Sequence, residues 1–212
     1  MKWTKDSVLE RLAAYPAKPN VRSNDDAEFF PLNEKSENPV LSNDKSLTPA
    51  AVLIPLINRS EEVTVLLTLR TEHLNNHAGQ ISFPGGQVDQ HDRDPEHTAL
   101  RETDEEIGLT AQQIEIVGRL DDYIIGTGFL VSPIIGFVDP PLNLTPHENE
   151  VADVFEAPLS FVTHPDNFER HTRDIKGSRR SYFAVQWNDH LIWGATAGML
   201  RDLSQRLWNG VQ

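Results

Sequence analysis

The sequence of 212 residues predicts an α/β sandwich with a mixed β-sheet. Two observations support this fold class: short apolar runs typical of buried strands lie on both sides of an amphipathic helix ending at Gly108, and a second helix closes the chain. Because the order is strand pair, helix, several strands, helix, it favours a mixed sheet over a regular βαβ winding. The length suits one domain with an appended segment.

The N-terminal part divides into two segments. Residues 4–15 predict a short helix, because Val8, Leu9 and Leu12 fall on one face before Pro16 ends the pattern. The segment that follows is rich in Pro, Asn, Ser and charge, without periodicity. We therefore expect residues 1–48 to form a helix and an extended arm packed on a main domain of residues 49–212.

The main domain is predicted to hold two hairpins and several further strands. The first hairpin joins the apolar runs 51–57 and 63–69 through a turn. Gly126 and Gly128 are expected in a turn at strand ends. Further strands are expected at 81–83, 114–120, 130–138 and 151–155, a second hairpin at 182–187 and 191–193, and a closing helix at 196–207.

The helix before Gly108 has marked ends. Asp94 is a suitable N-cap, Pro95 suits the first helical position, and Gly108 suits the residue beyond the C-terminus. An apolar face predicts packing on the sheet: Ala99, Leu100, Thr103 and Ile107. An adjoining arc of roughly 100° is acidic: it carries Glu102, Glu105 and Glu106.

Composition excludes several classes of function. The formal charge of −13 and the lack of a Lys/Arg cluster argue against nucleic-acid binding. The absence of cysteine excludes disulfides, thiolate zinc sites and cysteine nucleophiles. The N-terminus lacks the apolar core of a signal peptide, and the longest uncharged run, 123–138, is too short to span a membrane. We expect a cytoplasmic protein with no membrane partner, and a homodimer is left open.

The three clustered carboxylates have two explanations. Like charges at this spacing repel, and oxygen-only ligands suit a hard cation such as Mg²⁺ or Mn²⁺, which commonly acts on phosphates. The alternative is a solvated acidic face, helped by an ion pair between Arg101 and Glu105. Spacing alone favours the solvated face, and the surrounding residues favour the metal site.

Those surroundings resemble a known motif. Gly86 followed by Arg101-Glu102-Thr103-x-Glu105-Glu106-x-Gly108-Leu109 resembles the Nudix hydrolase box, G-x5-E-x7-R-E-U-x-E-E-x-G-U with U apolar. Thr103 replaces an apolar residue, and the spacing from Gly86 to Arg101 is one position longer, so the first box glutamate falls at Asp92 or Arg93. The resemblance implies a Nudix-like α/β/α sandwich and a phosphoric anhydride hydrolase. It also implies that Glu102, Glu105 and Glu106 hold Mg²⁺ or Mn²⁺, with Glu102 and Glu105 acting in catalysis.

A second resemblance narrows the substrate. Leu66-Leu-Thr-Leu-Arg70-Thr71, then Gly79 and Phe83-Pro-Gly-Gly86, is similar to the signature of the coenzyme A pyrophosphatase branch. It implies cleavage of coenzyme A or acyl-coenzyme A to adenosine 3′,5′-bisphosphate and a 4′-phosphopantetheine product. Thr71 stands where Ser or Ala is usual, and Asn75 where a second arginine is expected. The residues expected to contact the nucleotide substrate are Arg70, His77, Gly79, Phe83, Gly85 and Gly86.

Because Asn75 lacks the cation that could pair with substrate phosphates, two alternatives stay open. One is a hydrolase for another nucleoside diphosphate compound, such as ADP-ribose or a dinucleotide, and the other is a nucleotide-binding module without hydrolysis. For the general base, the segment Glu148-Asn149-Glu150 is the candidate, with Glu150 preferred and Glu102 as runner-up. A plain surface acid is the alternative for either residue of that segment.

Overall fold

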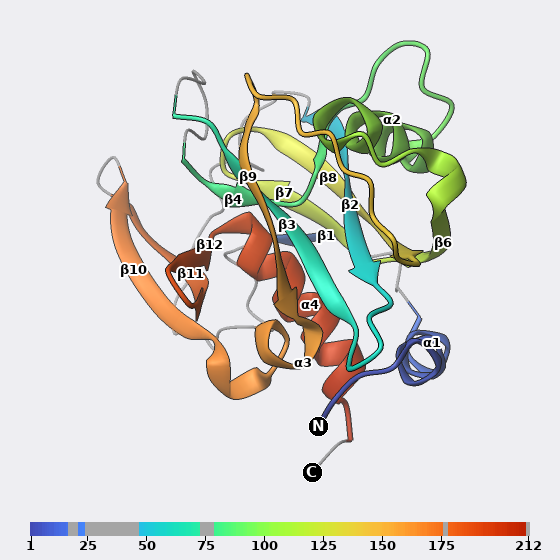
Figure 1. The fold of residues 1–212 in the computed structure, drawn as a ribbon. Coiled ribbons are helices and arrows are strands. Elements are labelled where there is room, and N and C mark those ends of the chain that lie inside the picture. The colour runs from blue at the N-terminus through green and yellow to red at the C-terminus, as the bar shows by residue number, and fades with distance from the viewer. Residues whose placement is uncertain (17–20, 24–46, 73–78, 176–177, 211–212) are drawn as a thin grey trace.

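A computed structural model describes residues 1–16, 21–23, 47–72, 79–175 and 178–210. These residues form a nine-stranded mixed sheet and a three-stranded antiparallel sheet, with helices packed around them (Figure 1). The prediction of an α/β fold with a mixed sheet is confirmed. No helix in these ranges has both the length and the apolar character needed to cross a membrane.

Two long parallel strands form the centre of the large sheet. β2 (Thr48–Ile57) pairs with β8 (Phe129–Val138) along its whole length. β8 also pairs with two antiparallel strands, β6 (Ile114–Arg119) and β7 (Asp122–Ile125), and the short β1 (Val21–Ser23) runs parallel to β7. β7 is absent from the sequence prediction, which placed a single strand over residues 114–120.

The other half of the sheet opens where β2 and β3 separate. β3 (Thr64–Arg70) pairs with β2 at two positions next to the turn of the predicted hairpin. It pairs with β9 (Val151–Pro158) along its length. Beyond that point β4 (Ile81–Ser82) pairs with β3, and β5 (Gly85–Gln87) pairs with β2. Residues 81–87 therefore bridge two diverging strands and carry the glycine pair into the opening. The glycine pair lies in the short strand β5, beyond the strand predicted at 81–83.

Alternating side chains give the large sheet two buried faces. Leu53 and Leu66 face one core, which includes Ala99 and Ile107 of α2 (Pro95–Ile107). The strand neighbours of opposite parity face a second core, formed with α1 (Lys5–Ala14) and α4 (Ala195–Trp208). Period-two alternation with apolar residues on both faces is what a sheet covered on both sides requires. The expected α/β/α layering is thus present (Figure 1).

The predicted punctuation of α2 is confirmed. The Asp94 carboxylate accepts from the main-chain N–H of His97 at 2.7 Å, and Pro95 is the first helical residue. Gly108 adopts a left-handed φ of 71° and donates its N–H to Asp104 O at 2.8 Å. Thr103 is fully buried, and its hydroxyl donates to Ala99 O at 2.6 Å, so this polar residue fits an apolar box position.

The smaller sheet consists of β10 (Glu169–Ile175), β11 (Ser178–Trp187) and β12 (His190–Trp193). The predicted hairpin of β11 and β12 is confirmed, whereas β10 was not predicted because its sequence is largely polar. One-turn helices complete the chain: η1 (Ala111–Gln113), α3 (Leu159–Val162) and η2 (Pro165–Asn167).

The N-terminal residues belong to the second core. Trp3 and Val8 have no exposed surface, and the rings of Trp3 and Trp208 meet edge to face with centroids 5.4 Å apart. Of the predicted arm, β1 lies within the described residues, and most of the rest lies outside them. Arg22 of β1 joins a buried ion cluster with three other residues: Asp121, Asp202 and Arg206. The domain division at residue 48 stays a prediction.

Candidate active site

The three box carboxylates differ in exposure. The Glu106 side chain is 3% exposed and points toward the opening between β2 and β3, the Glu102 side chain is 19% exposed, and the Glu105 side chain is 61% exposed. Glu102 and Glu106 stand one helical turn apart, which places them together on the helix surface. The sequence placed all three on an arc beside the packed face, and the structure orders them from buried to exposed across it.

Glu106 is held between β3 and β5. Its Oε1 lies 3.3 Å from Arg70 Nη1, and its Oε2 accepts from the Gly85 N–H at 3.3 Å. Burial raises the pKa of Glu106 to about 7, although Arg70 and the Gly85 N–H act in the opposite direction. The charges of Glu102 and Glu150 raise it further. Burial and the neighbouring carboxylates therefore disfavour the ionised form of Glu106 more than Arg70 and the Gly85 N–H favour it.

Glu102 lies directly against the glycine pair. A Cβ at Gly86 would approach the Glu102 carboxyl carbon to 2.5 Å, so only glycine admits the carboxylate at this position. Burial raises the pKa of Glu102, opposed by the hydrogen bond from Arg101 Nη1 at 2.9 Å. The charges of Glu105 and Glu150 raise it further.

An ion pair between Arg101 and the buried Asp92 lies beside the box carboxylates. Arg101 donates from Nε and Nη2 to the two oxygens of Asp92 at 3.1 and 2.8 Å, and from Nη2 to Gln87 O at 3.2 Å. Asp92 also accepts from Thr98 Oγ1 at 2.9 Å, and its side chain is fully buried. Arg101 chiefly holds the pKa of Asp92 well below its usual range. Of the two residues that the spacing allowed for the first box glutamate, Asp92 is the one that pairs with Arg101.

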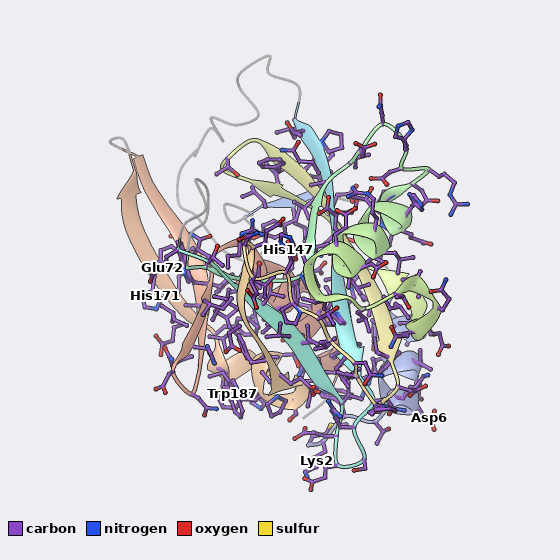
Figure 2. The ribbon with its side chains drawn as sticks, turned by 45° about the horizontal axis from the view of Figure 1, so that its top comes forward. Lys2, Asp6, Glu72, His147, His171 and Trp187 are labelled. Carbon is purple, nitrogen blue, oxygen red and sulfur yellow. The ribbon has the colours of Figure 1, made fainter. Side chains whose placement is uncertain are left out.

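The segment between β8 and β9 closes over the C-terminal end of α2. Thr145 N–H donates to Ile107 O and His147 N–H to Glu106 O, both at 2.8 Å, so this segment satisfies carbonyls that the helix end leaves free (His147 is labelled in Figure 2). Glu150 N–H in turn donates to His147 O at 2.8 Å. Glu150 is close enough for its charge to raise the pKa of both Glu102 and Glu106, whereas Glu148 is exposed.

The residues expected to bind substrate differ in exposure, and not all of them lie within the described residues. Arg70 is partly exposed beside Glu106, the Gly85 N–H donates to Glu106, and Gly86 lies against the Glu102 carboxylate. Gly79 lies in an exposed turn with φ of 67°. Phe83 is 2% exposed and belongs to the second core, so its expected substrate contact stays a prediction. His77 and Asn75 lie outside the described residues.

The oxygen donors of this site fit a hard divalent cation. Within the described ranges, no three acidic or histidine side chains are already grouped as a metal-binding set. The fit depends instead on the chemistry of two carboxylates, Glu102 and Glu106, which burial deprives of water and which Gly86 leaves unobstructed. Hard cations favour such oxygen ligands, and a bound cation would offset the unfavourable burial of charge. Glu105 could add a ligand from the exposed side.

This chain is similar to a known protein family. The NUDIX domain profile matches residues 47–189. Nudix hydrolase NudL of Escherichia coli K12, described as uncharacterized, is 38% identical over 160 residues, covering 74% of this chain and 82% of the relative. The NudL of Photorhabdus laumondii is 37% identical over 158 residues, covering 74% and 84%. A solved Ap4A hydrolase complex from C. elegans is 20% identical, with a TM-score of 0.46, covering 52% of this chain and 80% of that one.

The NUDIX match contains the strands, the glycine pair and the carboxylate helix that build the site. The relatives extend the similarity over most of both chains. The chain therefore belongs to the Nudix hydrolase family, whose members are pyrophosphohydrolases that act on small nucleotide substrates and generally use divalent metal ions.

Proposed function

We propose that this chain hydrolyses the diphosphate linkage of coenzyme A or an acyl-coenzyme A, giving adenosine 3′,5′-bisphosphate and 4′-phosphopantetheine or its acyl form. The observation that carries the proposal is the meeting of Glu102, Glu106 and Arg70 at the glycine pair. Carboxylates for a cation and a guanidinium for a phosphate are thereby brought to one opening in the sheet.

Each carboxylate has a proposed role. Glu102 and Glu106, with Glu105 from the exposed side, would hold Mg²⁺ or Mn²⁺. Such an ion neutralises a diphosphate and lowers the pKa of a bound water. Arg101 orients Glu102 by its hydrogen bond, and the buried Asp92 holds Arg101 in turn. Residues of the box thus act as ligands and supports of one site.

Glu150 is the proposed general base. It lies close enough to interact electrostatically with Glu102 and Glu106, and the main-chain contacts of its segment fix it against α2. A base must reach the attacking water, and a carboxylate beside the cation ligands meets that condition. Glu102 is the second candidate. Comparing Glu150→Gln with Glu102→Gln separates loss of the base from loss of a cation ligand.

Arg70 supplies the proposed phosphate contact. Within the described ranges, its Nε is buried without a hydrogen-bond partner, and its Nη1 contacts Glu106. A guanidinium recognises phosphate through several donors in one plane, so Arg70 can contact a substrate oxygen while it stays beside the cation site. The Leu66-to-Thr71 signature around Arg70 is the reason for preferring coenzyme A.

Asn75 supports a second candidate within the same reaction class. Where the coenzyme A signature has an arginine, this chain has an uncharged amide. A hydrolase for ADP-ribose or a dinucleotide does not need a cation for a 3′-phosphate. Loss of a box carboxylate would favour the third possibility, a nucleotide-binding module without hydrolysis, and all three carboxylates are retained.

Product analysis tests the proposal. Purified protein with Mg²⁺ or Mn²⁺ is incubated with coenzyme A, dephospho-coenzyme A, ADP-ribose, NADH and nucleoside triphosphates, and the products are identified by mass spectrometry. The proposal predicts 4′-phosphopantetheine and adenosine 3′,5′-bisphosphate from coenzyme A at the highest kcat/KM. Faster cleavage of ADP-ribose or NADH would replace coenzyme A as substrate, and no cleavage of any compound would refute a hydrolytic function.

A further inference from the structure

Thr71 connects the end of β3 to the segment that carries Glu150. It directly follows Arg70 and is 8% exposed. Its hydroxyl donates to Asn149 O at 2.9 Å, and its main-chain N–H donates to Glu150 O at 3.0 Å. Two successive carbonyls of the segment are therefore held by one residue.

The register of β3 and β9 explains why Thr71 reaches this segment. Leu69 pairs with Asp153 but Arg70 pairs with Val151, so β9 contains one extra residue at this point. Such a bulge bends a strand and redirects side chains, and bulges are frequent beside active sites. Here it brings the residues before Val151 opposite the end of β3. Consecutive residues then serve the site: Arg70 contacts Glu106, and Thr71 holds the backbone of Glu150.

The other side of the same segment is fixed to the helix. His147 N–H donates to Glu106 O, and Glu150 N–H donates to His147 O, both at 2.8 Å. Glu150 therefore belongs to a turn anchored to α2 on one side and to β3 on the other. The α2 anchor uses main-chain groups alone and would survive most substitutions, whereas half of the β3 anchor depends on the Thr71 hydroxyl.

We propose that Thr71 is a positioning residue that sets the place of Glu150 relative to Glu102 and Glu106 through the hydroxyl bond to Asn149 O. The inference rests on the proposed role of Glu150 as general base. The signature that this chain resembles has Ser or Ala at this position, and serine can keep the bond whereas alanine cannot.

Thr71→Val and Thr71→Ser form a matched pair. Valine keeps the shape and removes the donor, while serine keeps the donor and removes the methyl. Loss of one neutral hydrogen bond is expected to lower kcat about three- to tenfold in Thr71→Val, with KM nearly unchanged because only 8% of Thr71 is exposed to a ligand. Thr71→Ser should retain kcat within about twofold of the wild type. Equal losses in both variants would refute a role for the hydroxyl.

A double-mutant cycle with Glu150→Gln tests whether Thr71 acts through Glu150. If it does, Thr71→Val adds no further loss of kcat in the Glu150→Gln background, since the group that it positions is already disabled. Full additivity of the two losses would refute the positioning role. Thermal unfolding of all variants shows whether any loss reflects a damaged fold.

Hydrogen exchange provides a readout that needs no activity. In Thr71→Val the amides of residues 147–151 should exchange faster than in the wild type and in Thr71→Ser, while those of α2 stay protected. Unchanged exchange in residues 147–151 would refute the anchoring role. If the wild type hydrolyses none of the nucleotide compounds, the proposed function and the catalytic part of this inference fail together, and the exchange comparison still decides the anchoring part.

Discussion

Glu106→Gln should stabilise the metal-free protein at alkaline pH while it abolishes the cation site. Burial raises the pKa of Glu106 from its ordinary 4.5 to about 7. In the folded state this carboxyl prefers to be protonated, so ionisation opposes folding. Below pH 4.5 both folded and unfolded states are protonated and the favourable contribution is fully present. As the pH rises through about 7, that contribution is lost.

The magnitude follows from the difference between the two pKa values. At about 1.4 kcal/mol per pH unit, raising the pKa from 4.5 to about 7 corresponds to about 3 kcal/mol of stability lost between acidic and alkaline conditions. The substituted glutamine amide would be neutral throughout and could still accept from Arg70 or Gly85. The variant should therefore be more stable than the wild type at pH 8 by up to about 3 kcal/mol, and equal to it near pH 4.5.

Urea unfolding of both proteins at several pH values, with a chelator present to remove metal ions, measures this difference in stability. Glu105→Gln is the matched control, because it removes the same charge from a side chain that is 61% exposed. The control should show little pH-dependent gain. If Glu106→Gln is no more stable than the wild type at pH 8, or if the control gains as much, the buried carboxylate is not the source of the effect.

Further predictions concern the cation, the substrate and the fold. Glu102→Gln and Glu106→Gln should each lower turnover at least about a hundredfold with the fold intact, and near-native rates at limiting metal would contradict the ligand assignment. Mg²⁺ or Mn²⁺ should raise the Tm of the wild type more than that of Glu102→Gln, whereas equal rises would place the ion elsewhere. Asn75→Arg should lower KM for coenzyme A with kcat unchanged, raising kcat/KM by about 1 kcal/mol, and an unchanged KM would remove the support for that substrate. Arg206→Met should lower the free energy of unfolding in urea by about 3–5 kcal/mol, because it removes a cation from buried Asp121 and Asp202. The control Arg93→Met, at an exposed residue, should change that free energy little.

Local signals in the sequence were sufficient for α2. An N-cap, a proline at the first position and a left-handed C-terminal glycine act within a few residues, so Asp94, Pro95 and Gly108 specify the helix without tertiary information. The apolar runs of β2, β3 and β8 were predictable for the same reason. By contrast, β10 is polar and is a strand because β11 pairs with it, and the glycines of β5 are a strand because β2 pairs with them.

The arrangement of the site depended on contacts that spacing does not encode. With Ala99, Thr103 and Ile107 on the packed face, helical periodicity already places Glu106 nearer that face than Glu105. It does not encode the contacts of Glu106 with Arg70 and Gly85. Spacing left Asp92 and Arg93 open for the first box glutamate, and it did not encode the bidentate pairing of Asp92 with Arg101. Thr71 and His147 gave no signal as supports of the site, because their roles depend on the bulge in β9 and on the free carbonyls of α2.

Charge explains why an acidic protein can be suited to a phosphate substrate. At the site, the guanidinium groups of Arg70 and Arg101 face five carboxylates: Asp92, Glu102, Glu105, Glu106 and Glu150. The raised pKa values of Glu102 and Glu106 result from burial and this excess of negative charge. A divalent cation would offset the excess and present positive charge to a diphosphate, whereas adding arginines would neutralise the carboxylates without providing a bound water for attack. The same excess that disfavours the empty site therefore favours the cation that the reaction needs.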